Sequence, residues 1–95
     1  MSEVDAIRLT AEDNVATVLR AIAVGEVIRI REEGMVTLLT AEEAVPMCHK
    51  ICVEPIAPDQ AVVKYGQRIG QATTAIAAGR HVHVHNLRSA RARPR

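Results

Sequence analysis

Ala75-Ile76-Ala77-Ala78-Gly79 is the stretch that decides the fold, because the chain contains two further copies of its pattern. The copies are Ala21-Ile22-Ala23-Val24-Gly25 and Pro55-Ile56-Ala57-Pro58-Asp59, and a β-branched run follows each of the three. A Gly or Asp at the fifth position suits a tight turn that needs a positive φ. The copies are unequally spaced along the chain, which argues against a solenoid. We therefore expect one compact unit that reuses a strand–turn–strand corner.

The segments around these corners have the composition of short strands, rich in Val, Ile and Leu. Glu32-Glu33-Gly34 predicts a hairpin turn, Tyr65-Gly66 predicts a second turn, and Ile69-Gly70 marks another tight point. The expected strands are Ala6–Leu9, Val15–Arg20, Val27–Arg31, Met35–Leu39, His49–Val53, Val62–Val63, Gln71–Thr74 and Val82–Val84. Seven or eight short strands in 95 residues predict a contorted all-β domain with at most one or two helical turns.

Residues 10–22 are open to two interpretations. Thr10 and Asp13 resemble a helix capping box, and the apolar residues that follow have helical spacing. The other copies of the repeat are short and β-rich, so we favour a strand at Val15–Arg20. Thr40-Ala41-Glu42-Glu43 is a second capping-box match, but Pro46 limits any helix there to about one turn.

The composition bounds the class of protein. Apolar residues make up 48% of the chain, with no Phe or Trp and a single Tyr, so the core is expected to be thin and aliphatic. Such a core suggests that a larger partner covers part of it. A net charge of +1 and the lack of aromatic residues argue against a nucleic-acid partner. Cys48 and Cys52 are expected to be reduced, partly buried thiols, because C-x3-C is not a zinc-knuckle spacing.

Neither a membrane span nor a signal peptide is expected, because no apolar run is long enough and the first residues are acidic. We therefore expect a cytoplasmic protein. Basic residues gather at the C-terminal end, where Pro94 and the lack of apolar periodicity predict a solvated tail or a subunit contact. The expected organisation is one domain over residues 1–88 and a basic, disordered tail over 89–95.

His81-Val82-His83-Val84-His85-Asn86 is the first candidate site, since three of the four histidines stand at alternate positions. In a strand, His81, His83 and His85 would share one face and could converge on a metal ion or an anion. No acidic residue lies near them in sequence, so further ligands would come from another chain. Asn86 could orient an imidazole or hold a substrate hydroxyl. The alternative is an exposed edge strand with solvated histidines.

Two lysine-containing pairs are further candidates. His49-Lys50 begins a strand, and a lysine beside an apolar run can bind a carboxylate or act as a base when it is desolvated. In Lys64-Tyr65-Gly66 the only aromatic residue adjoins a lysine and a turn. Both lysines could equally be surface residues with solvated ammonium groups, and Tyr65 could be a lid over the core.

The ordered set of these motifs resembles the SAF domain of the altronate/galactarate dehydratase family. The resemblance is strongest over residues 49–88 and weaker near Asp13–Ala16 and Ile22–Gly25. It is carried by His49-Lys50-Ile51, Ile56-Ala57, Lys64-Tyr65-Gly66, Ile69-Gly70-Gln71-Ala72-Thr73, Ile76-Ala77-Ala78-Gly79 and His81–Asn86. It implies a β-clip fold that occurs either within a longer dehydratase or as a separate small subunit.

The resemblance also implies an activity, an iron-assisted β-elimination in which a base removes the proton beside a carboxylate and water leaves. The chain would be the small subunit of a hydro-lyase acting on a sugar acid, would share Fe²⁺ with a large dehydratase subunit, and could pair with itself when alone. The alternatives are the alpha subunit of a sulfolactate sulfo-lyase, which releases sulfite, and a non-catalytic module that binds a carbohydrate or a partner. The implied residues are His49, Lys50, His83 and His85 for catalysis, Lys64, Tyr65 and Asn86 for the substrate, and His81, His83 and His85 for the metal.

Two positions depart from the family pattern. Cys48 stands where the family usually has Gly before the His-Lys pair, which questions the local geometry at His49. Asp59 replaces the Gly of the middle corner, but Asp tolerates left-handed geometry. Residues 31–48 match the family poorly.

Overall fold

Nine short strands build the chain in a computed structural model, which describes residues 4–90. They are β1 (Ala6–Arg8), β2 (Val15–Val18), β3 (Val27–Glu32), β4 (Met35–Thr40), β5 (Lys50–Cys52), β6 (Ala61–Lys64), β7 (Gln67–Ala72), β8 (His81–Val82) and β9 (Leu87–Ser89). Residues 4–90 contain no helix, so the all-β prediction and the strand favoured at Val15 are confirmed. Accordingly, this part of the chain has no helix that could span a membrane.

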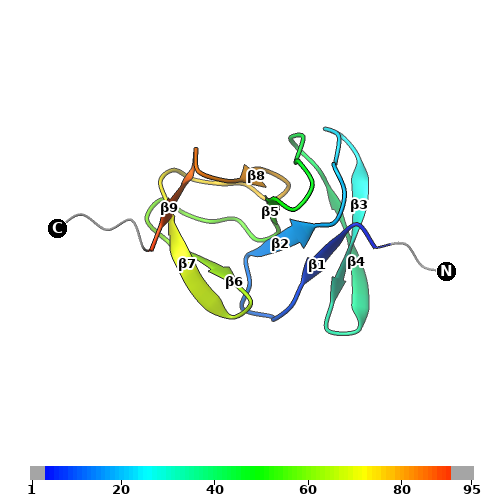
Figure 1. Cartoon of the computed structure of the whole chain (residues 1–95), viewed down its shortest axis with the longest axis horizontal. Coiled ribbons are helices and arrows are strands. Elements are labelled where there is room, and N and C mark those ends of the chain that lie inside the picture. The colour runs from blue at the N-terminus through cyan, green and yellow to red at the C-terminus, as the bar shows by residue number, and fades with distance from the viewer. Residues whose placement is uncertain (1–3, 91–95) are drawn as a thin grey trace.

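The strands form two sheets (Figure 1). The larger has the order β4-β3-β1-β2-β5-β8, and the smaller has the order β6-β7-β9. All neighbours are antiparallel except β1 and β3. Hydrogen bonding continues to Ala90, whose N–H donates to the carbonyl of Ile69. The remainder of the predicted tail, residues 91–95, lies outside the described residues.

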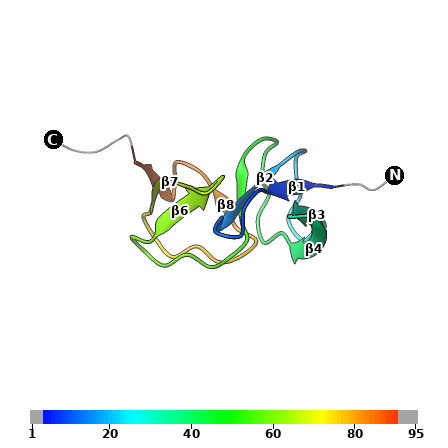
Figure 2. The ribbon, with the colours of Figure 1, turned by 90° about the horizontal axis from the view of Figure 1, so that it is seen from below.

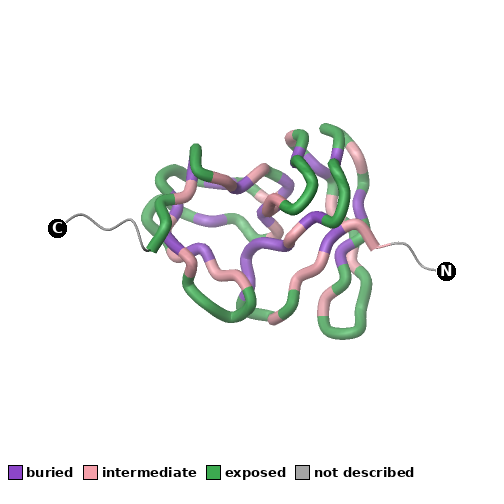
Figure 3. Tube along the Cα trace, viewed as in Figure 1, coloured by how far each residue is buried: buried purple, intermediate pink, exposed green. Residues whose placement is uncertain are grey.

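Strands β2 and β5 form a wall shared by two small cores. In β2, Val15 faces one core and Ala16 the other, and in β5 Cys52 and Ile51 divide in the same way. The alternation of side chains along a strand therefore serves both cores at once. Figure 2 shows the lobes on either side of this wall, and Figure 3 shows buried segments in both.

Each core is closed by a pair of corners, and the structure contains four corners rather than the three found by sequence. The fourth is Ala44-Val45-Pro46-Met47-Cys48. Its sequence does not match the repeat, because it lacks both the isoleucine and the final Gly or Asp. The second residue of each corner is buried, and these residues pair through isolated bridges. The bridges join Ile22 with Val45 and Ile56 with Ile76.

The fifth residue of every corner has a positive φ, as predicted for the three corners recognised in the sequence. The values are 88° for Gly25, 72° for Cys48, 68° for Asp59 and 90° for Gly79. In each corner the N–H of the next residue donates to the carbonyl of the third residue, as from His49 to Pro46. A single positive φ at the third position of such a four-residue turn defines a type II turn.

Neither capping-box motif begins a helix: Thr10 and Asp13 lie in the β1–β2 loop, and Thr40 ends strand β4. Thr10 and Asp13 make the expected local bonds, with 2.7 Å between Thr10 Oγ1 and Asp13 Oδ1. The carboxylate of Asp13 is 1% exposed and also accepts from the backbone N–H groups of Tyr65 and Gly66, at 3.0 Å and 2.8 Å. These long-range bonds attach the β1–β2 loop to the β6–β7 hairpin, and the chain leaves Asp13 as a strand.

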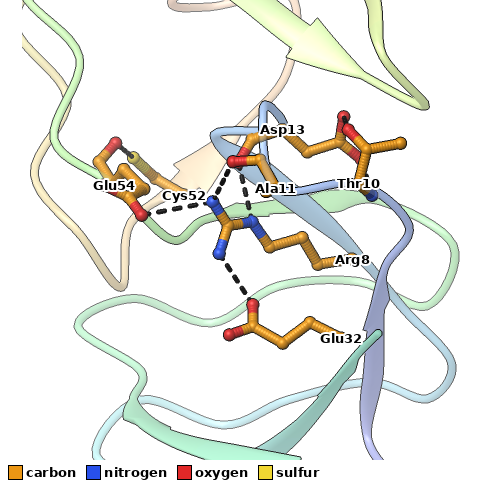
Figure 4. A network of polar contacts seen from close by, with 7 residues as sticks. All are labelled: Arg8, Thr10, Ala11, Asp13, Glu32, Cys52 and Glu54. Atoms are coloured by element: carbon orange, nitrogen blue, oxygen red, sulfur yellow. Dashed lines mark hydrogen bonds and ion pairs between the residues drawn. The ribbon is translucent and has the colours of Figure 1, made fainter. Parts of the chain in front are cut away.

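Arg8 makes a second connection between distant segments (Figure 4). Its guanidinium pairs with Glu32 at 2.7 Å and with Glu54 at 3.2 Å. It also donates at 2.8 Å to the carbonyls of Ala11 and Asp13. The Arg8 side chain is 12% exposed, so these bonds satisfy a largely buried cation and join β1 to β3 and to the β5–β6 loop.

Replacing Cys48 with Gly should stabilise the protein, because Cys48 has a side chain and a φ of 72°. The left-handed conformation costs roughly 1–2 kcal/mol, and the greater freedom of unfolded glycine offsets part of the gain. We expect Cys48→Gly to raise the free energy of unfolding in urea by about 0.5–1 kcal/mol. Met47→Gly, one position earlier and without a positive φ, should lower it; equal losses in both variants would contradict the strain argument.

Asp13 should contribute to stability above pH 4 and lose this contribution in acid. Burial alone would raise its pKa, but hydrogen bonds from Gly66, Thr10 and Tyr65 outweigh burial and lower it. The folded state therefore holds the proton less tightly than the unfolded state, whose pKa is about 3.9, and stability falls as the pH falls through the folded pKa. Asp13→Asn should cost about 2–3 kcal/mol at pH 7, and urea unfolding should show a weaker acid dependence than in the parent. An unchanged pH dependence would contradict this role.

Candidate histidine site

The corners bring two distant segments of the chain together at the candidate site. His49 follows the corner that ends at Cys48, and β8 follows the corner that ends at Gly79. A side chain at Gly79 would place a Cβ 2.5 Å from the carbonyl oxygen of Thr40, so this corner needs glycine for space as well as for φ. Antiparallel pairing sets Ile51 opposite His81, and the same register continued brings His49 beside His83.

Three imidazoles converge there. The His49 Nδ1 and His81 Nε2 atoms are 2.8 Å apart, and the His49 and His83 rings stack with centroids 4.0 Å apart. One nitrogen from each of His49, His81 and His83 lies within 4.8 Å of the others. Two ligands at right angles on a metal with bonds of about 2.1 Å would be about 3 Å apart. The 2.8 Å distance between His49 Nδ1 and His81 Nε2 therefore fits two neighbouring ligands of one metal ion. Without an ion, the same distance fits a hydrogen bond between the two rings.

The expected continuous strand from His81 to Asn86 is wrong. Strand β8 ends at Val82, and a turn occupies residues 83–86. Val82 is fully buried, whereas Val84 is 81% exposed, so the two valines do not share a buried face. His85 still lies near the cluster, with its ring centroid 5.2 Å from that of His81. The structure thus brings together all four histidines, with His49 in the converging set in place of His85.

Asn86 explains why the strand ends. Its Oδ1 accepts from the N–H of His83 at 3.0 Å, and its Nδ2 donates to the carbonyl of His81 at 2.9 Å. The backbone N–H of Asn86 also donates to the carbonyl of His83 at 3.0 Å. Asn86 is 7% exposed. Its side chain thus replaces the bonds that a partner strand would make and fixes the direction of the histidine turn.

The environment favours neutral imidazoles at His81 and His83. Burial lowers the pKa of His81, and so do His49, His85 and His83, whereas Glu43 raises it. Desolvation also lowers the pKa of His83, as do His49 and Lys50. A neutral imidazole has a free lone pair, which a metal ligand or a general base requires.

Lys50 and Lys64 belong to the same region. Burial lowers the pKa of Lys50, and the charge of Lys64 lowers it further. The Lys64 Nζ lies 4.9 Å from the centroid of the Tyr65 ring. Tyr65 is half-exposed at the β6–β7 turn, with a φ of 57°, so it is not a lid over the core. No acidic side chain within residues 4–90 forms an ion pair with either lysine, and their charges remain available to an anion.

Glu43 is the residue that sequence reasoning missed. Its Oε1 accepts from the backbone N–H of His81 at 2.8 Å, and its Oε2 lies 3.4 Å from Arg80. A carboxylate therefore lies beside the histidines within the same chain, contrary to the expectation from sequence distance. Only recognition of the fourth corner, which begins at Ala44, would have placed Glu43 here.

A shallow depression of about 410 Å³ adjoins the cluster. Its lining includes Glu43, Arg80, His85 and Asn86, together with Thr74 and residues 75–77 of the last corner. This surface combines charged, amide and hydroxyl groups with apolar ones, as a site for a small polar ligand does.

The two cysteines differ in environment. Cys48 is exposed and Cys52 is buried, and both are free thiols. Burial raises the pKa of the Cys52 thiol to about 12, so it remains protonated. Both cysteines are free thiols, as expected, but neither is partly buried, because Cys48 is exposed and Cys52 is fully buried.

The geometry defines an all-β domain with clustered imidazoles, an adjoining polar depression and two lysines that have no acidic partner among residues 4–90. Residues 4–90 match the family model described as the altronate/galactarate dehydratase SAF domain. The chain belongs to this family, as the motifs in its sequence indicated.

Two kinds of curated relative resemble the chain. It is 30% identical over 84 residues to the (2R)-sulfolactate sulfo-lyase subunit alpha of Chromohalobacter salexigens, an alignment that covers 85% of this chain and 89% of that protein. It is 39% identical over 83 residues to the altronate dehydratase of Escherichia coli and 35% identical over 83 residues to that of Bacillus subtilis. Those alignments cover 87% of this chain but only 16% of either dehydratase. The family is thus one of lyases and dehydratases.

Removing the side chain of Asn86 should loosen the histidine turn. Asn86→Ala leaves the N–H of His83 and the carbonyl of His81 without their partner, which should cost about 1–3 kcal/mol of unfolding free energy. The histidine ring signals in NMR spectra should shift and broaden. Gln71→Ala removes one exposed amide bond to Asp59 and should cost less than about 0.5 kcal/mol. Unchanged ring signals in Asn86→Ala would contradict the positioning role.

Proposed function

We propose that this chain is the small component of a two-component lyase that dehydrates a sugar acid by metal-assisted β-elimination. The observation that carries the proposal is the convergence of His49, His81 and His83, whose nitrogens lie within 4.8 Å of one another. Family membership supports the reaction class, because the relatives are named as altronate dehydratases and sulfo-lyase subunits.

His49, His81 and His83 would hold the metal, which we propose to be Fe²⁺. Imidazole nitrogens suit Fe²⁺, and the neutral state favoured at His81 and His83 leaves their lone pairs free. The bound ion would act as a Lewis acid on a substrate oxygen. Glu43 and Asn86 would orient the cluster through the backbone of His81 and His83, as outer partners orient metal ligands.

The lysines would hold the substrate. Burial and the charge of Lys64 disfavour the charged form of Lys50, and a substrate carboxylate beside Lys50 would offset this penalty. Tyr65 would border the same anion, since its ring lies next to Lys64. In the elimination, a base removes the proton on the carbon beside this carboxylate, the electron pair forms the new double bond, and the hydroxyl on the next carbon leaves as water. Lys50 and His85, which both lie close enough to His83 to lower its pKa, are the candidate proton-transfer groups.

A larger partner would complete the site. The clustered histidines are only partly buried, and the depression beside them is shallow and open, so this chain alone does not enclose a ligand. In the Escherichia coli and Bacillus subtilis relatives the matching segment is 16% of a much longer chain, and the Chromohalobacter salexigens relative is named a subunit. We therefore propose that a separate large subunit supplies the missing ligands and walls. Free thiols at Cys48 and Cys52 fit a reducing compartment, and we propose the cytoplasm.

Desulfonation of sulfolactate is the second candidate. It is favoured by the (2R)-sulfolactate sulfo-lyase subunit alpha, of which the alignment covers 89%. The same lysines would bind the carboxylate, and sulfite would leave in place of water.

The test is capture of the tagged full chain from its native cells, followed by iron analysis and assays of the complex on altronate, galactarate and sulfolactate. We expect a large partner, bound iron and turnover of one of these acids. Changing His49, His81 or His83 singly to Ala should lower turnover by about 100-fold or more, because the loss of a ligand costs at least as much as the loss of its outer partner. Arg68→Ala, an exposed change on β7, is the control and should leave turnover unchanged.

Three outcomes would count against the proposal. A complex without iron that binds a carbohydrate but transforms none of the acids would favour a non-catalytic binding module. Full turnover in the three histidine variants would remove the cluster from the reaction. Capture without any large partner would overturn the two-component arrangement.

A further inference from the structure

Strand β4 is an unprotected edge of the larger sheet. Among the described strands it pairs only with β3, over six residue pairs without a register shift. Its sequence, Met35-Val36-Thr37-Leu38-Leu39-Thr40, contains no charge, no Pro and no Gly. Proteins usually block such an edge with charges, prolines, bulges or very short strands, because its outer backbone groups can pair with another strand.

The other edge strands of the two described sheets, β8, β6 and β9, each have a feature that hinders further pairing. At the opposite edge, β8 has two residues. In the smaller sheet, the β6–β7 pairing shifts register between Val62 and Val63. Strand β9 carries Arg88 in its centre. The absence of any such device from β4 distinguishes it.

Strand β4 also exposes apolar side chains on its outer face. Val36 is 50% exposed and Leu38 is 69% exposed. The register sets them opposite Arg31 and Arg29 of β3, on the face away from the core residues Ile28 and Ile30. A strand that leaves two such side chains uncovered gains apolar contact when another strand lies beside it.

We propose that β4 pairs with β4 of a second copy of this chain, in antiparallel orientation, so that the two larger sheets join into one. Opposite residues in an antiparallel ladder point to the same face. A twofold axis at Thr37 therefore sets Val36 opposite Leu38 of the second copy, and each Leu38 opposite Val36. Both pairs are apolar and lie on the outer face.

Charge favours a second copy as the occupant. The uncharged β4 brings no like charges together when it meets itself. Arg29 and Arg31 lie on β3, so the two arginine rows would be three strand spacings, about 14 Å, apart. This distance exceeds the Debye length of about 8 Å at physiological ionic strength. The dimer would leave the histidine cluster free, because β4 and β8 are at opposite ends of the strand order.

Sedimentation of the full chain over a wide range of concentration tests the proposal. We expect a reversible monomer–dimer equilibrium, with slower amide hydrogen exchange in β4 at high concentration. The double variant V36K/L38K sets like charges across the axis and should raise the dimer dissociation constant by about 100-fold or more. Both residues are exposed, so the monomer should keep its fold, which the circular dichroism spectrum and the β5–β8 amide signals would verify.

The matched control is L9K/L19K, which adds the same two charges at exposed apolar residues outside β4 and should dimerise like the parent. A monomer at every concentration, or a dimer that V36K/L38K leaves intact, would overturn the proposal. Protection of β4 that arises only when a large partner is added would assign this edge to that partner instead. Because these readouts need no catalysis, they stand or fall separately from the proposed lyase activity.

Discussion

The left-handed residue that ends each corner is the constraint on which the rest of this structure depends. Four type II turns reverse the chain at Gly25, Cys48, Asp59 and Gly79, and their bridges close the two small cores. Neither core contains an aromatic side chain, and small aliphatic residues with Cys52 fill them, so each core is thin and depends on the corners that close it. The corners ending at Cys48 and Gly79 also deliver the two segments of the site, because the histidines follow directly after them.

Much of the fold could be predicted from the sequence because the repeat records backbone geometry. A Gly or Asp at a fixed offset after a buried isoleucine favours a positive φ, as Gly25, Asp59 and Gly79 show. The apolar residues in 10–22 have helical spacing, but the other two copies of the repeat lie in short, β-rich segments. The repeat therefore predicted a strand there, and the structure has β2 at Val15–Val18. The hairpin turn at Glu33-Gly34 could be predicted for the same reason, since both residues have a positive φ.

The details of the site could not be predicted, because they depend on side-chain bonds to the backbone and on contacts between distant segments. Alternating histidines indicate a strand, but Asn86 bonds the backbone of His81 and His83 and turns the chain after Val82. Glu43 is 38 residues from His81 in sequence and approaches it only through a corner without Gly. Likewise, the local pattern predicts that Asp13 caps a helix. In the folded chain its carboxylate instead accepts hydrogen bonds from Tyr65 and Gly66, more than 50 residues away. Local patterns thus identified the residue types of the site, whereas the contacts of His81 with His49 and with Glu43 span 32 and 38 residues.

The fold itself brings His49 against His81 and His83, so that one surface carries a preformed histidine cluster, which we propose to be half of a lyase site. Nuclear Overhauser contacts between assigned histidine ring protons in the full-length chain test this claim most directly. We predict strong contacts between the rings of His49 and His83, and weaker ones between His81 and His85, in protein without metal or partner. Independent, rapidly reorienting rings with no contact between His49 and His83 would contradict it.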